Sequence, residues 1–237
     1  MLDPLAFVAS VSLDAATSGG SDQEATSDYL ARLSDLLTLM TPRPILPQDF
    51  AVLVQRSYPQ VARCVAIDLY KADTQTPNTP RCVTVVPIDD AGNALDATTK
   101  SDIDAFLQAR REVNFLAYVA DPTYTMIDVQ FTVHSYPGYD PVDVAARVVD
   151  TLTAYLTPGN WGLPPYGDTS GRSWINDTKV RYLELTEQVN RTEGVHYVDT
   201  LTFRTGAAAY ATTDITLTGV APLPRPGSIT GTATAET

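Results

Sequence analysis

Hydrophobic and polar residues alternate with two distinct periods along this chain of 237 residues, and each period predicts a different element. Over residues 127–134 the period is two, so Ile127, Val129, Phe131 and Val133 share one face of a predicted strand whose other face is polar. Elsewhere the apolar residues recur every three or four positions, which is typical of amphipathic helices. Such helices are predicted from residue 27 to the prolines at 42 and 44, from Pro47 through at least Val54, over residues 102–111, from Pro141 to the Pro158-Gly159 pair, and over residues 179–190.

Proline residues set several of the helix ends. Pro42 and Pro44 end the first helix, because proline lacks the backbone donor and pushes its predecessor out of the helical region. Pro47 and Pro141 suit the first turn of the next helices, and Asp140 is a good cap before Pro141. Inward stripes are expected at Ile103, Phe106 and Leu107, at Ala145, Val148, Leu152, Tyr155 and Leu156, and at Leu183 and Val189. Further strands are predicted over residues 61–70, 81–88, 116–119, 194–203 and 215–218.

This order of elements predicts an α+β fold. We expect two small α/β sandwich modules, in which helices pack on small mixed sheets, together with an extended C-terminal arm. The predicted boundaries are residues 1–26 for an N-terminal strand and Gly-rich turn, 27–122 for the first module, 123–218 for the second and 219–237 for the arm. Residues 1–13 lack the basic start of a signal peptide and are interpreted as a strand entering a sheet.

The last 19 residues are rich in Pro, Gly, Thr, Ser and Ala and offer few side chains for a core of their own. Two alternatives remain: the segment is disordered, or it lies on a neighbouring subunit and adds a strand there through its alternating Ile229, Thr230 and Thr232. Pro224 and Ile229 are the candidate contact residues of this arm. The loop of residues 72–80 is also expected to be exposed, with Thr76 and Pro77 at its tip as candidate contact residues.

A long loop, residues 160–174, carries three aromatic side chains, Trp161, Tyr166 and Trp174. Long loops often make functional contacts, and aromatic residues are common at the centres of interfaces. The alternative is that the loop tucks its tryptophans against the adjacent helix. In a different class of protein, the three rings would form a platform that stacks on cell-wall glycans.

Composition narrows the function classes. The formal net charge of −12 argues against nucleic acid as the main partner, because phosphate binding needs clustered Lys and Arg. Hydrophobic residues make up 44% and charged residues 19%, as in ordinary globular proteins, and no apolar run is long enough to span a membrane.

We find no catalytic, cofactor-binding or metal-binding set, and the chain is not expected to be an enzyme. His134 falls on the polar face of its strand and is interpreted as a solvated surface residue rather than a ligand. His196 is alone between Val195 and Tyr197 and is interpreted as structural. Residues 89–93 are acidic but lack the ligand spacing of an EF-hand, so a turn is expected. Cys64 and Cys82 are more simply free, buried thiols than a disulfide, although both alternatives remain.

A series of short motifs resembles the baseplate J-like family of phage tail proteins. The motifs occur in the family's order: Gly19-Gly20-x-Asp22, Tyr29-Leu30-x-Arg32-Leu33, Pro42-Arg43-Pro44, Pro47-x-Asp49-Phe50, residues 51–66, Tyr136 to Pro141 and Glu193 to Val198. Members of the family usually carry a further N-terminal region, so the likeness is to their C-terminal portion. The chain is then either a short version or the distal part of a longer protein.

The resemblance implies a structural virion protein of the tail baseplate. Such a protein would form a wedge or ring as a homo-oligomer, link the central hub to peripheral tail-tip proteins, and be made in the bacterial host cytoplasm before it joins the virion. A phage-derived bacterial injection system would use the same fold, and the sequence does not separate the two.

Overall fold

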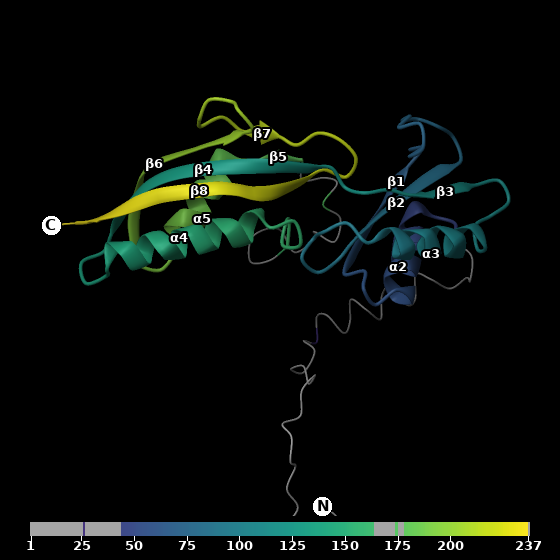
Figure 1. The fold of residues 1–237 in the computed structure, drawn as a ribbon, viewed down its shortest axis with the longest axis horizontal. Helices are drawn as coiled ribbons and strands as arrows, with labels where there is room; N and C mark the ends of the chain where they lie inside the picture. The colour runs from purple at the N-terminus through teal and green to yellow at the C-terminus, as the bar shows by residue number, and fades with distance from the viewer. Residues whose placement is uncertain (1–25, 27–43, 164–173, 175–177, 237) are drawn as a thin grey trace, which may run out of the picture. The chain divides into compact units, whose positions relative to one another are not determined.

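A computed structural model describes residue 26 and residues 44–163, 174 and 178–236 (Figure 1). The predicted first helix and most of the Gly-rich turn therefore lie outside the described residues. Residues 39–237 form one compact unit. The mixture of helices with small mixed sheets confirms the predicted α+β class.

The first sheet has the strand order β1-β2-β3. Its strands are β1 (Arg63–Asp68), β2 (Cys82–Ile88) and β3 (Leu116–Val119), with β1 antiparallel and β3 parallel to β2. Helix α2 (Pro47–Ser57) begins at the predicted proline, and the Asp49 carboxylate accepts hydrogen bonds from the N–H groups of Ile45 and Leu46. Helix α3 (Ala97–Gln108) buries Ile103 and Leu107 in the same core.

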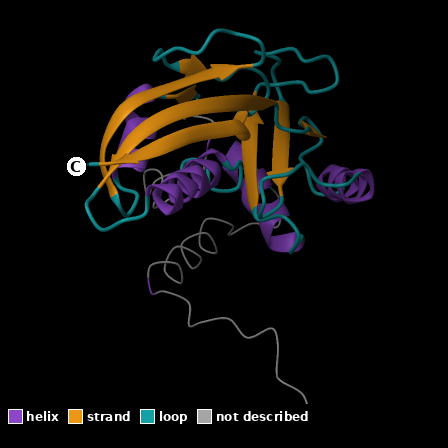
Figure 2. Cartoon of the chain, turned by 60° about the vertical axis from the view of Figure 1, so that its left-hand side comes forward, coloured by secondary structure: helices purple, strands orange, loops and turns teal. Residues whose placement is uncertain are grey.

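The second sheet has the strand order β6-β4-β8. Its strands are β4 (Tyr124–Ser135), β6 (Val195–Thr205) and β8 (Leu223–Ala235), with β6 antiparallel and β8 parallel to β4. The four apolar side chains with period two in β4 are all buried, as predicted. Helices α4 (Pro141–Leu156) and α5 (Tyr182–Asn190) cover one face, and a two-stranded ribbon of β5 (Lys179–Val180) and β7 (Ile215–Thr216) lies nearby (Figure 2).

The hydrophobic cluster of the second sheet extends into the first sheet. Strand β2 is buried along its whole length: Val83 and Val85 contribute to the cluster beneath α2 and α3, while Val86 and Ile88 join Val65 in the cluster of the second sheet. A strand buried on both faces needs apolar residues at successive positions rather than alternation, and the sequence of β2 supplies them. The two sheets are therefore joined by packing as well as by the connecting chain.

Several element-level predictions need correction. Helix α3 starts at Ala97 rather than residue 102, because the Asp96 carboxylate caps it by accepting from the Thr99 N–H at 2.9 Å. Helix α5 starts at Tyr182, after a short strand, and in this register Leu183 is 77% exposed and Leu185 is buried. In α4, Val144 is buried in place of the predicted Ala145.

The largest correction concerns the C-terminal segment. The prediction of a disordered segment or an arm on a neighbouring subunit is wrong for residues 223–235, because they form β8 and pair with β4 of the same chain. Strand β8 supplies one of the three strands of the second sheet, and its Leu223 is fully buried.

Candidate interface surfaces

The two tryptophans of the predicted contact loop lie in the core. Trp161 is 1% exposed and Trp174 is fully buried. The Trp161 ring packs edge-on against Tyr155 at 5.4 Å, and the Trp174 Nε1–H donates to the Ala221 carbonyl at 3.1 Å. Of the two alternatives, the structure therefore supports the tucked loop for these two side chains. Tyr166 lies outside the described residues.

Arg63 occupies the junction between the two sheets. Although it is only 8% exposed, its Nη1 donates to the carbonyls of Gly159 at 3.1 Å and Trp161 at 2.9 Å, and its guanidinium lies 4.9 Å from the Trp174 ring centroid. Burial lowers the pKa of Arg63 to about 10, because desolvation disfavours the charged form. This side chain joins β1 to the loop that follows α4, a role that sequence reasoning missed.

The turn of residues 89–93 completes the junction. Gly92 has a φ of +80°, and a Cβ placed on it would lie 2.2 Å from the Gly159 nitrogen, so the two backbones are in close contact. The Tyr124 hydroxyl donates to the Gly92 carbonyl at 2.7 Å, and Arg225 donates to the Asn93 side chain at 2.7 Å. The sequence correctly predicted a turn here, but its role is to hold the two sheets together.

The hairpin between β1 and β2 has an exposed tip. Thr76 and Pro77 are both exposed, and Lys71 and Thr76 exchange backbone hydrogen bonds that define the loop. Lys71 also pairs with Asp73 at 3.1 Å. The predicted contact residues of this loop are thus accessible, and their partner stays a prediction.

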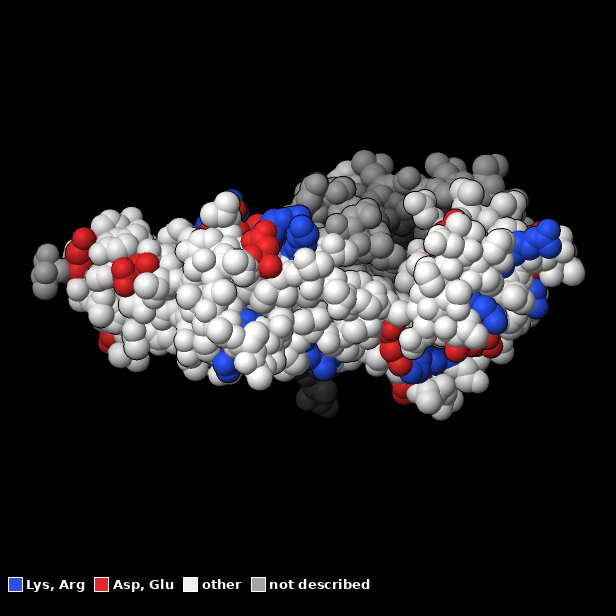
Figure 3. Space-filling model, turned by 90° about the horizontal axis from the view of Figure 1, so that it is seen from above, with Lys and Arg blue, Asp and Glu red and all other residues white. Residues whose placement is uncertain are grey.

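The face of the second sheet opposite the helices is polar, and among residues 44–163, 174 and 178–236 nothing fills the hollow on it. Threonine side chains from all three strands line a shallow hollow of about 440 Å³, together with Gln130; they are Thr132, Thr200, Thr202, Thr230 and Thr232. Viewed from above, the left part of the molecule shows few Lys, Arg, Asp or Glu side chains (Figure 3). Of the two predicted arm residues, Pro224 is buried and Ile229 is half-buried against the core.

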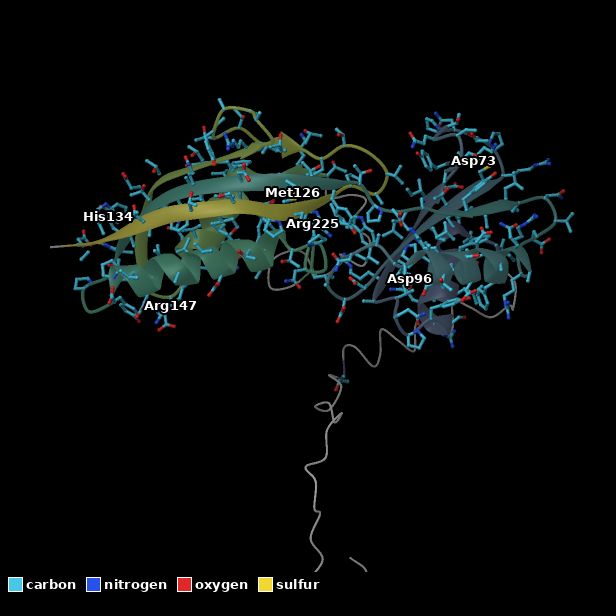
Figure 4. All side chains as sticks on the ribbon, in the orientation of Figure 1. Asp73, Asp96, Met126, His134, Arg147 and Arg225 are labelled. Carbon is cyan, nitrogen blue, oxygen red and sulfur yellow. The ribbon has the colours of Figure 1, made fainter. Side chains whose placement is uncertain are left out.

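Both histidines lie near the far end of this sheet. His134 stacks on Tyr197 with ring centroids 4.4 Å apart, and His196 lies 4.5 Å from the Tyr136 ring and contacts the Glu236 carboxylate. Figure 4 places His134 at one end of the β4–β8 pair, and Met126 and Arg225 toward the other. Contrary to the sequence interpretation, His196 is not isolated.

The described residues offer little chemistry. Among them, no group of three His, Cys, Asp or Glu side chains is placed to hold a metal ion, and no helix is long and apolar enough to cross a membrane. Cys64 and Cys82 are free and buried, and burial raises the pKa of the Cys64 thiol. The features that remain are surfaces: the hairpin tip, the threonine face and the edge of β8.

No family model matches this sequence, and neither does any curated protein. Solved structures do resemble its fold. A chain in the cryo-EM structure of the anti-feeding prophage (AFP) baseplate, 6-fold symmetrised, aligns with a TM-score of 0.60 at 15% sequence identity. This chain shares its fold with a chain of that baseplate. The alignment covers 88% of this chain but 43% of the AFP chain, so the chain spans less than half the length of that neighbour.

This likeness agrees with the sequence resemblance at the coarse level of phage-tail-like baseplates. It does not show membership of the baseplate J-like family, which stays a prediction.

Proposed function

We propose that this chain is a structural component of a phage-tail-like baseplate and acts through its surfaces rather than by catalysis. One observation carries the proposal: the fold match to a baseplate chain extends over 88% of the residues. The finer role that we propose is a wedge or ring element, built from several copies, that links the central hub to peripheral proteins of the tail tip.

The contacts between the two sheets support a role in which the chain holds neighbouring proteins at fixed positions. The buried Arg63, the Gly92–Gly159 contact and the shared hydrophobic cluster join the two sheets over several independent contacts. A protein that links neighbouring parts of an assembly benefits from such rigidity, because its binding surfaces then keep a fixed spacing. The exposed hairpin tip and the threonine face lie on different sheets and offer two separate surfaces for partners.

Removal of the gene from the particle-producing host tests the proposal. We expect particles without assembled baseplates, and recovery when the wild-type chain is supplied in trans. The double variant Thr76→Gly with Pro77→Gly changes only the exposed hairpin tip and should fold normally. Supplied in place of the wild-type chain, it tests whether the tip is needed for baseplate assembly. Complete baseplates in the deletion strain would overturn the proposal.

A phage tail and a phage-derived injection system remain two settings for the same proposed role. The glycan-binding alternative has less support, because Trp161 and Trp174 are buried and so do not offer a stacking platform on the surface.

A further inference from the structure

Within the described part of the chain, the outer edge of β8 has no strand beside it. Strand β8 is terminal in the order β6-β4-β8, and no described strand pairs with its outer side. From Val129–Ile229 to Ser135–Ala235 its pairing with β4 continues without a register shift. Residues 229–235 carry no charge and no proline, and most are exposed. Charges, prolines, bulges and covering loops are the usual protection of such edges, so this one is open to pairing.

The hydrogen bonds of β8 show which groups face outward. The Ser228 N–H donates to the Asp128 carboxylate and the Glu236 N–H donates to the Ser135 carbonyl, so both point toward β4. Backbone groups of successive residues in a strand point to alternate sides. The N–H and C=O groups of the odd-numbered residues therefore point away from the sheet; these residues are Ile229, Gly231, Ala233 and Ala235.

The two faces of β8 specify what kind of strand would fit beside it. Ile229 and Ala233 pack against the core on the helix side, whereas Thr230 and Thr232 line the polar hollow on the other side. A partner strand should therefore be uncharged, with apolar residues on one face and small or polar residues on the other.

Residues 5–13 of this chain, LAFVASVSL, have that pattern. Leu5, Phe7, Ala9, Val11 and Leu13 alternate with Ala6, Val8, Ser10 and Ser12, and the segment has no charge. Paired with β8, the first set would face the helix side and the two serines the threonine side. The intervening residues 14–43 could span roughly 100 Å when extended, which is enough to reach another subunit.

We propose that residues 5–13 of one copy add a strand to the outer edge of β8 of a neighbouring copy. The inference rests on the proposed multi-copy assembly. A segment and an edge are two different surfaces, so the contact is heterologous and can repeat around a closed ring.

Cysteine cross-linking between two separately purified variants tests the contact directly. Thr232→Cys protein is mixed with each of Val8→Cys, Ser10→Cys and Ser12→Cys protein and oxidised. A disulfide-linked dimer of the two different variants is expected in at least one mixture. Thr202→Cys, on β6 at the opposite edge of the same face, is the matched control and should give no such dimer. Absence of the mixed dimer from all three mixtures would overturn the inference.

Two edge-blocking variants provide a second measurement, by sedimentation of the full chain. Ala233→Pro removes an outward N–H, and Thr232→Lys places a charge beside the edge. Each should shift the protein from oligomer to monomer with an unchanged circular dichroism spectrum, and deletion of residues 1–13 should do the same. A folded edge variant that keeps the wild-type oligomer would contradict the inference. Baseplate incorporation is measured separately, so failure here leaves the proposed function standing.

Discussion

Arg63 is a single side chain on which several backbone carbonyls converge. Lysine would keep the charge but not the planar fork that reaches these carbonyls, so Arg63→Lys should lower the free energy of unfolding by about 2 kcal/mol. Arg63→Ala should cost more, since packing against Trp174 is also lost. Urea titration followed by tryptophan fluorescence suits this test, because both tryptophans are buried nearby.

Arg191 serves as the control for this experiment. It pairs with Glu187 on the surface of the α5 end, where both side chains are more than half exposed. Arg191→Ala should change stability little. A similar loss in the two arginine variants would contradict the role assigned to the buried one.

Gly92 and Gly138 form a matched pair for the junction turn. Both have positive φ, +80° and +96°, but a Cβ at Gly92 would meet Gly159 and Pro158 within 2.5 Å, whereas nothing lies within 4 Å at Gly138. Gly138→Ala should therefore cost about 1 kcal/mol from backbone strain alone. Gly92→Ala should cost roughly 3 kcal/mol or more. Thermal unfolding of the two variants checks the difference, and equal losses would argue against the close contact.

Asp128 links the three strands of the second sheet at the point where the register between β4 and β8 shifts. Its carboxylate accepts from the Ser228 N–H of β8 at 2.9 Å and from Arg204 Nε of β6 at 3.2 Å, and these two groups lower the pKa of Asp128, the backbone N–H more strongly. Because the folded pKa lies below the unfolded one, the stabilisation is complete above the ordinary pKa of about 4 and is lost as pH falls through the lowered value.

Asp128→Asn keeps an acceptor but removes the charge. We expect the free energy of unfolding to fall by about 1–2 kcal/mol at pH 7 and by less below pH 4, as measured by urea unfolding across pH. Asp73→Asn, in an exposed pair with Lys71, is the control and should have little effect. A difference between wild type and Asp128→Asn that stays constant down to pH 2 would exclude a charge effect.

At the scale of elements, truncation tests whether the second sheet can fold without β8. Truncation after Pro222 removes a strand that pairs with β4 along its length and whose Leu223 is fully buried. We expect the second sheet to lose cooperative folding, with its dispersed amide signals missing from a two-dimensional NMR spectrum. Truncation after Ala235 keeps the whole strand and should retain the wild-type spectrum. A well-folded protein without β8 would mean that the strand is dispensable.

The same element shows why some of the fold could be predicted and some could not. The period of two in β4, the Asp140–Pro141 start of α4 and the strand at residues 116–119 depend on local patterns, and the structure confirms them. Strand β8 is rich in Thr, Gly, Ala and Pro, and only its pairing with a distant strand makes it ordered. Whether this segment is ordered therefore depends on tertiary contacts and could not be predicted from its composition.

For the candidate surfaces as well, features set by local sequence could be predicted and features set by distant contacts could not. The exposure of Thr76 and Pro77 follows from local turn chemistry and was predictable. The burial of Trp161 and Trp174 was not, because it depends on Arg63 and Ala221, which lie far away along the chain. Likewise, nothing adjacent in sequence indicates that Gly92 contacts Gly159.

At the scale of the whole molecule, the hydrophobic cluster that includes residues of both sheets and the junction contacts pack the two sheets together within residues 39–237. This arrangement fits the proposed role, in which the chain transmits position between neighbouring proteins. Its assembly is then governed by surfaces that the fold holds at fixed places, including the outer edge of β8.

The most direct test of this account is cryo-electron microscopy of intact particles whose copy of the chain carries a small tag in the exposed turn of residues 206–209. This turn lies outside the proposed contact surfaces, so the tag should not disturb assembly. The account predicts extra density repeated around the axis at the tail tip. Particles with complete baseplates and no tag density, with the tagged chain free in the lysate, would contradict it.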